Sequence, residues 1–190
     1  YNKKIKKNKQ YIGYVGRIEV EKGWEVFLDC IKLLKENNEI NNKNVIIVGN
    51  GKDSEKLNLK IKEYKLEDII ERKPLVSQNE LNNLYNEMKI FCFPTYRESL
   101  GLVAIEAMAC GVPVIGSDIN PLKEYINHGE NGYLFKCGDH MDLYTQISNC
   151  LKIGKEKEIR LSKNAMRTSQ EYETLKVEAK LKVIFENLIR

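Results

Sequence analysis

The chain has 190 residues, 42% of them hydrophobic and 31% charged, which suffices for one sizeable domain with its own core. No run of 18 or more apolar residues occurs, so the sequence predicts no membrane-spanning helix. Much of the formal net charge of +4 lies in the Lys- and Asn-rich segment 1–10, which we interpret as a linker. Basic residues are not interleaved with aromatic residues on one face, which argues against nucleic-acid binding.

In the first half of the chain, short apolar runs alternate with helical patterns. The predicted strands are 11–15, 45–48 and 68–71, and the predicted helices are 22–37, 54–64 and one that begins at the capping box Ser77–Glu80. The β-branched run 45–48 is typical of a strand in a buried parallel sheet.

The second half continues this alternation. The predicted strands are 90–93, 112–116 and 133–135, and the predicted helices are 101–110, 121–126, 139–153, 155–169 and 174–188. Strands that alternate with helices indicate βαβ units and an α/β fold with a Rossmann-like, doubly wound parallel sheet. We therefore expect one domain over residues 11–170, followed by a helical C-terminal tail at 171–190.

One acidic residue interrupts the central helix. Residues 101–110 are apolar except for Glu106, and a helix that is apolar on every side belongs in a protein interior. A carboxylate in such a helix requires a partner. A second carboxylate, Glu98, stands just before the helix. The helix could be a simple core element, with Ser99 as its N-cap and Glu106 paired internally.

The start of this helix also predicts an anion site. If the helix begins near Ser99, the free N–H groups around Gly101, Leu102 and Val103 point out of the sheet edge. Such an end binds anions, phosphate above all.

Further polar residues follow the other predicted strands. Arg17 and Lys22 follow the first strand, the turn 49–51 follows the second, and Arg72 and Lys73 follow the third. Ligands of open α/β sheets bind at these carboxyl ends. If the ends converge, two cations face the N–H groups of the central helix, which suits a diphosphate. The alternative is that these cations are solvated surface charges.

The carboxylates suit hydroxyl groups. Glu106 could accept both hydroxyls of a ribose, and Glu98, nearer the solvent, could accept from another polyol. No metal site is expected, because the only two histidines, His128 and His140, lie in separate predicted loops. The five cysteines are irregularly spaced, without a Cys-x-x-Cys pair, which indicates free thiols in a reducing compartment.

Four motifs occur in order along this pattern, at residues 16–23, 48–51, 94–114 and 129–134. Together they resemble the C-terminal, nucleotide-sugar-binding half of a family 4 retaining glycosyltransferase with the GT-B fold. The resemblance implies transfer of a sugar from a nucleotide-diphosphate sugar, most of all a UDP-sugar, to an acceptor with retention of anomeric configuration. It implies neither a cofactor nor a metal.

The resemblance also implies roles for single residues. Arg17 and Lys22 would hold the diphosphate and stabilise the leaving nucleotide, and Glu98 would contact the donor sugar. The other donor-binding residues that it implies are Gly16, Gly49, Asn50, Gly51, Arg72, Ser99, Leu100, Gly101, Leu102, Val103 and Glu106. Pro74 departs from the family pattern, which usually has glycine there, in the loop expected to contact the base.

The resemblance implies partners outside this chain. A saccharide or lipid-linked acceptor would bind through an N-terminal domain, so we expect this chain to bind a nucleotide without catalysing alone. Polysaccharide or glycolipid biosynthesis in the cytoplasm, with peripheral association at the inner membrane face, would follow from the family.

Two other functions remain open. Gly49-Asn-Gly51 follows a strand and opens a helix, as in a dinucleotide-dependent oxidoreductase, although Ser54 stands at the third glycine position. The second is a non-catalytic nucleotide-binding module.

Overall fold

The computed structural model describes residues 10–41 and 44–173, and beyond them only 176, 178, 182 and 185. In this part of the chain a six-stranded sheet has the order β3-β2-β1-β4-β5-β6, and all neighbouring strands are parallel. The strand order reverses between β1 and β4, which is where ligands bind in doubly wound sheets. The predicted Rossmann-like parallel sheet is confirmed.

The elements lie close to their predicted positions. The strands are β1 (Tyr11–Val15), β2 (Val45–Val48), β3 (Ile70–Lys73), β4 (Met88–Phe93), β5 (Val114–Ser117) and β6 (Gly132–Phe135). The helices are η1 (Val20–Lys22), α1 (Trp24–Glu36), α2 (Ser54–Glu63), α3 (Gln78–Glu87), α4 (Leu102–Ala109), α5 (Asn120–Lys123), α6 (His140–Leu151), α7 (Lys155–Ser169) and η2 (Gln170–Tyr172). The predicted linker 1–10 and the predicted helix 174–188 lie outside the described residues, apart from isolated positions.

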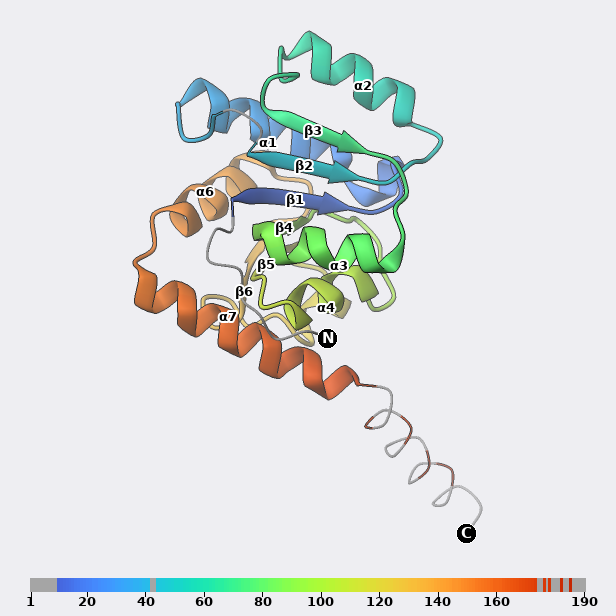
Figure 1. Cartoon of the computed structure of the whole chain (residues 1–190), viewed down its shortest axis with the longest axis vertical. Coiled ribbons are helices and arrows are strands. Elements are labelled where there is room, and N and C mark those ends of the chain that lie inside the picture. Colours follow the sequence, from blue (N-terminus) through green and yellow to red (C-terminus); the bar gives the residue numbers. More distant parts are fainter. Residues whose placement is uncertain are drawn as a thin grey trace.

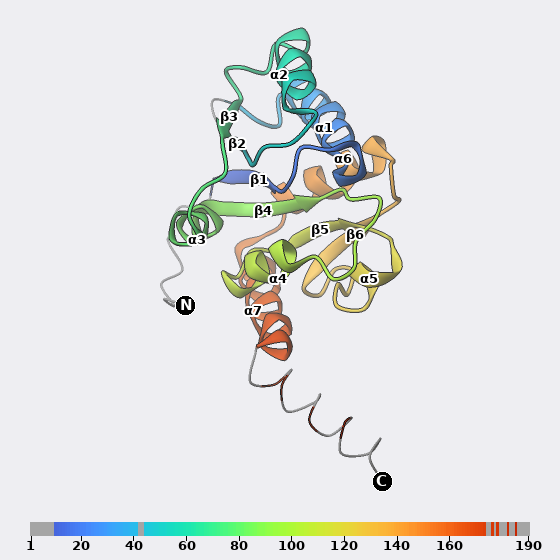
Figure 2. The ribbon, with the colours of Figure 1, turned by 90° about the vertical axis from the view of Figure 1, so that its right-hand side faces the viewer.

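Helices cover both faces of the sheet (Figure 1). The edge-on view shows α1, α2 and α6 on one side and α3, α4 and α7 on the other (Figure 2). Each side has its own apolar core, with Trp24, Phe27 and Ile31 of α1 in one and Ala104 and Met108 of α4 in the other. Since β2 is buried along its whole length, its sequence is apolar on both faces.

The third strand corrects one prediction. It spans Ile70–Lys73 rather than 68–71, because its register on β2 runs from Ile70 beside Val45 to Lys73 beside Val48. Arg72 and Lys73 therefore lie in the strand and not in the loop after it. As an edge strand, β3 accommodates polar side chains that a central strand would exclude.

Over the described residues, no helix is both long enough and apolar enough to span a membrane.

Candidate functional site

The loop between β1 and α1 accepts hydrogen bonds from a buried tyrosine of β1. The Tyr14 hydroxyl, on a residue that is only 2% exposed, lies 3.1 Å from the carbonyl oxygen of Arg17 and 3.3 Å from that of Lys22. Gly23 ends the loop with a φ of +69°, and a Cβ atom there would lie 1.8 Å from the carbonyl oxygen of Pro94. Only glycine lets this loop approach the end of β4 so closely.

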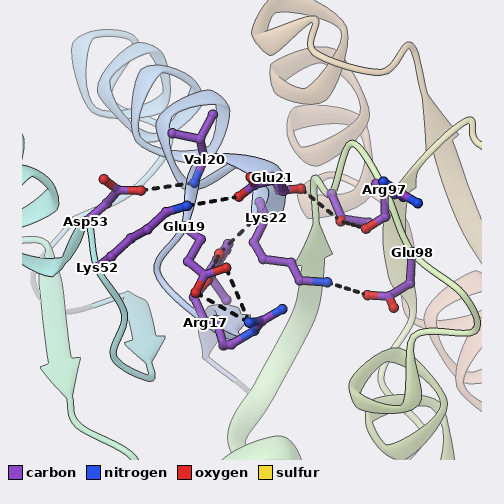
Figure 3. A network of polar contacts seen from close by, with 11 residues as sticks. Arg17, Glu19, Val20, Glu21, Lys22, Lys52, Asp53, Arg97 and Glu98 are labelled. Carbon is purple, nitrogen blue, oxygen red and sulfur yellow. Dashed lines mark hydrogen bonds and ion pairs between the residues drawn. The ribbon is translucent and has the colours of Figure 1, made fainter.

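Hydrogen bonds join this loop to the loop between β4 and α4 (Figure 3). The Tyr96 N–H donates to the Glu21 carbonyl at 2.9 Å. The buried Thr95 hydroxyl lies 3.1 Å from the same carbonyl and 2.9 Å from that of Arg97. The two loops therefore form one hydrogen-bonded wall at the switch point of the sheet.

An ion pair between Lys22 and Glu98, the predicted cation and carboxylate, also joins the two loops (Figure 3). Lys22 Nζ lies 2.8 Å from Glu98 Oε2, and the two side chains are 18% and 16% exposed. Glu98 Oε1 accepts the Ser99 N–H at 3.0 Å, which fixes the carboxylate. Arg17 is the more open cation, 69% exposed and 3.4 Å from Glu19.

The central helix, predicted at 101–110, begins within one residue of that start but is not capped by Ser99. Gly101 is its N-cap with a φ of +81°, and α4 starts at Leu102 rather than near Ser99. A left-handed residue at 101 separates Ser99 from the helix, so Ser99 is not the N-cap. The N–H groups of Leu102 and Val103 belong to the first turn and have no partner within the helix. An anion can therefore bind at this end.

A cavity of about 620 Å³ lies between these elements. The predicted residues that line it are Gly16, Arg17, Lys22, Gly49, Asn50, Glu98, Ser99, Leu100, Gly101, Leu102 and Val103. The structure thus brings the cations, the carboxylate and the helix start to one cavity. Gly51, Arg72 and Glu106 are not among the lining residues.

Arg72 forms hydrogen bonds to the backbone at the end of β2, next to the cavity. Its guanidinium donates to the carbonyl oxygens of Ile47 at 3.1 Å and Gly49 at 3.0 Å. Burial lowers the pKa of Arg72. The prediction that Arg72 lies in a base-contacting loop is wrong in its location, because the side chain secures the end of β2.

Glu106 lies one helical turn behind the cavity wall. It is half-buried, and its Oε2 accepts the hydroxyl of Tyr85 at 3.3 Å. Val103, three residues earlier on the same helix face, lines the cavity. The mid-helix carboxylate therefore has the internal partner that its burial requires.

Apolar residues on the β3–α3 side of the cavity were missed by the sequence analysis. Leu75, Val76 and Leu81 line this side, and Leu75 is 83% exposed. Val76 and Leu81 flank the confirmed cap, where Ser77 Oγ accepts the Glu80 N–H, at the spacing of a hydrophobic staple. An apolar pair directly after Pro74, outside any predicted element, was the available signal. The other lining residues that were missed are Tyr14, Val15, Val48 and Phe93.

The glycine turn after β2 does not present a free helix start. Gly51 packs against the backbone of Ile18, and Asp53 stands at the start of α2. The Asp53 carboxylate accepts the Val20 N–H at 3.1 Å, and the ion pair with Lys56 holds the pKa of Asp53 below its usual value. A carboxylate here repels a pyrophosphate, which argues against dinucleotide binding at this turn.

Among residues 10–41 and 44–173 and the four isolated positions, no group of three His, Cys, Asp or Glu side chains could hold a metal ion. All five cysteines are free thiols. The expectation that the site works without a metal remains a prediction.

The fold and cavity define a Rossmann-like domain with a cationic pocket at its switch point. The chain belongs to the family of glycosyl transferases group 1, whose model matches residues 2–168. It is 31% identical over 126 residues to a D-inositol 3-phosphate glycosyltransferase of Paenarthrobacter aurescens, covering 65% of this chain and 31% of that protein. It is 29% identical over 143 residues to the capsular polysaccharide biosynthesis glycosyltransferase CapM of Staphylococcus aureus, covering 74% and 36%.

Solved structures share the fold. Anabaena HepE in complex with UDP and glucose superimposes with a TM-score of 0.81 at 21% identity, over 95% of this chain and 49% of that one. The C-terminal domain of LpcC, a group 1 glycosyl transferase of Francisella tularensis, gives 0.74 at 21% identity over 89% and 95%. The chain therefore has the fold of such a C-terminal domain. It spans about a third of the length of the two curated relatives.

Proposed function

We propose that this chain is the donor-binding half of a retaining family 4 glycosyltransferase that takes its sugar from a nucleotide-diphosphate sugar. The observation that carries the proposal is the shared cavity, lined by Arg17, Lys22, Glu98 and the start of α4. Membership in the glycosyl transferases group 1 family supports it.

The diphosphate lies, in this proposal, between the cations and the helix start. Arg17 offers fork-like hydrogen bonds, Lys22 offers a compact charge, and Leu102 and Val103, which line the same cavity, offer the N–H groups of the first turn of α4. The diphosphate carries two negative charges in the nucleotide sugar and gains a third as the bond to the sugar breaks, so electrostatic stabilisation is the main catalytic contribution of this half. No step requires a metal.

The base, the ribose and the donor sugar bind, in this proposal, on either side of the diphosphate. The apolar residues Leu75, Val76 and Leu81 offer a surface for the flat face of a base. Glu98 accepts hydroxyls of the donor sugar, and Glu106 accepts the ribose hydroxyls once the ligand reaches past Val103. UDP is the proposed nucleotide, and its presence in the HepE complex supports this choice.

The acceptor would bind outside this chain. We infer a saccharide or lipid-linked acceptor that binds through an N-terminal domain, in polysaccharide or glycolipid biosynthesis, and the similarity to CapM supports this class. The free thiols support a reducing compartment, which we take to be the cytoplasm. Peripheral attachment at the inner membrane face is inferred from the family alone.

Calorimetric titration with uridine, UMP and UDP tests the phosphate site. If cations and the helix start bind the diphosphate, affinity rises from uridine through UMP to UDP, and the UDP affinity falls as salt is raised. Equal affinity for uridine and UDP would contradict the proposal.

A further inference from the structure

We propose that the ion pair between Lys22 and Glu98 makes the cavity select a nucleotide that still carries its sugar over the bare nucleoside diphosphate. This inference rests on the proposed function. It assigns to the pair a role in ligand discrimination, which neither residue performs alone.

In the free protein, Lys22 and Glu98 bind each other. Glu98 occupies the position that a phosphate would take beside Lys22, and Lys22 occupies the position that a sugar hydroxyl would take beside Glu98. Lys22 Nζ and Glu98 Oε2 are 2.8 Å apart, and both side chains are more than four-fifths buried. The two come from loops that are joined by the Tyr96 to Glu21 backbone hydrogen bond. The joined loops keep the two side chains within reach of each other, and a phosphate that enters the cavity competes with Glu98 for the ammonium of Lys22.

Displacement has different consequences for the two oxygens of Glu98. Oε1 stays on the Ser99 N–H at 3.0 Å, so the carboxylate remains in the cavity wall. Oε2 loses its cation and faces the incoming phosphate in a poorly hydrated place, where an uncompensated charge is unfavourable. A bare diphosphate thus binds against a repulsive carboxylate.

A sugar attached to the diphosphate removes this penalty. Its hydroxyls donate to Oε2 just as its phosphates accept from Lys22, so both members of the broken pair regain partners. The nucleotide that carries its sugar therefore binds more tightly than the nucleoside diphosphate product that has lost it. Product release is favoured because the ion pair re-forms.

The neighbouring carboxylate of Glu21 provides a matched control. It belongs to the same η1 turn but is 56% exposed and pairs with Lys52 at 3.8 Å. It is not one of the residues that line the cavity. Glu21→Gln therefore removes an equal charge from the rim without releasing Lys22.

The test compares Glu98→Gln with Glu21→Gln by calorimetry, using UDP, inorganic pyrophosphate, UDP-glucose and UDP-N-acetylglucosamine as probes. Glu98→Gln should bind UDP and pyrophosphate about tenfold more tightly than the unaltered chain, which corresponds to about 1.4 kcal/mol. Its preference for the better of the two UDP-sugars over UDP should shrink by a similar factor. Glu21→Gln should change each affinity by less than about twofold.

UDP and pyrophosphate affinities that are unchanged or lower in Glu98→Gln would overturn the inference but leave the diphosphate site intact. Failure of every variant to bind either UDP or pyrophosphate would overturn the proposed function as well. Glu98→Ala, which also removes the carboxylate that pairs with Lys22, should gain UDP affinity too, and it serves if the glutamine variant does not fold.

Discussion

The hydroxyl oxygen of Tyr125 lies directly behind Gly101, 3.1 Å from the position that a Cβ atom on that glycine would occupy. Tyr125 is 3% exposed, and its hydroxyl has no hydrogen-bond partner among the described residues. A buried hydroxyl without a partner is destabilising. Gly101, the N-cap of α4, thus packs against the Tyr125 hydroxyl, a polar group that does not stabilise the fold.

Tyr125→Phe should therefore raise the free energy of unfolding by about 1 kcal/mol, measured by urea denaturation. Tyr85→Phe is the matched control, because the Tyr85 hydroxyl donates to Glu106, and its loss should lower stability by about 1–2 kcal/mol. Equal destabilisation by both substitutions would show that the Tyr125 hydroxyl has a partner.

Gly23→Ala should displace the loop that carries Lys22. The left-handed backbone alone costs about 1–3 kcal/mol, and the new Cβ atom would meet the carbonyl of Pro94. Gly129→Ala isolates the first effect, since Gly129 has a φ of +82° and no atom within 4 Å of the added Cβ. We expect lower UDP affinity only for Gly23→Ala. Similar UDP affinities for the two variants would contradict the close approach at Pro94.

Arg17→Ala should weaken binding of UDP at least about tenfold and leave uridine affinity nearly unchanged, because in the proposed complex the guanidinium contacts phosphate and not the nucleoside. Arg97→Ala, an exposed arginine of the β4–α4 loop that does not line the cavity, is the control for net charge. Calorimetry distinguishes the two. Parallel losses for uridine and UDP in Arg17→Ala would argue against a phosphate role.

Arg72→Met should lower stability by about 2–3 kcal/mol, because it leaves the carbonyl oxygens of Ile47 and Gly49 without their charged donor. The relative affinities for UDP and GDP should not change, since the side chain does not line the cavity. A changed preference between these two bases, with stability intact, would restore Arg72 to a base-contacting role.

Acid stability depends on Glu39. The Ser148 hydroxyl at 2.6 Å, the Tyr144 hydroxyl at 2.7 Å and Lys152 at 3.1 Å all lower the pKa of this carboxyl. Since the folded pKa is below the unfolded value of about 4.3, the contribution is present above that pH and is lost as pH falls through the folded pKa. Glu39→Gln should lower stability at pH 7 and flatten its decline below about pH 5. An unaltered acid slope would contradict this linkage.

The sequence predicts the sheet well because most strands are short apolar runs between turns, as at 45–48. The 155–169 helix matches α7 at both ends. The convergence of Arg17 and Glu98 on one cavity followed from the rule that parallel strands end at the same edge.

The misses have physical causes. The Lys22–Glu98 pair joins residues 76 positions apart, so no local pattern reveals it. The start of α4 depends on the left-handed Gly101, which helix propensity does not show. Arg72 follows a polar residue in an edge strand, a pattern that resembles a loop.

The most direct test of the donor-binding function is calorimetric titration of this chain with UDP, GDP, ADP and NAD at moderate salt. We predict that one nucleoside diphosphate, UDP above the others, binds, and that NAD does not. Binding of NAD alone would contradict the account and return the chain to the dinucleotide-binding alternative.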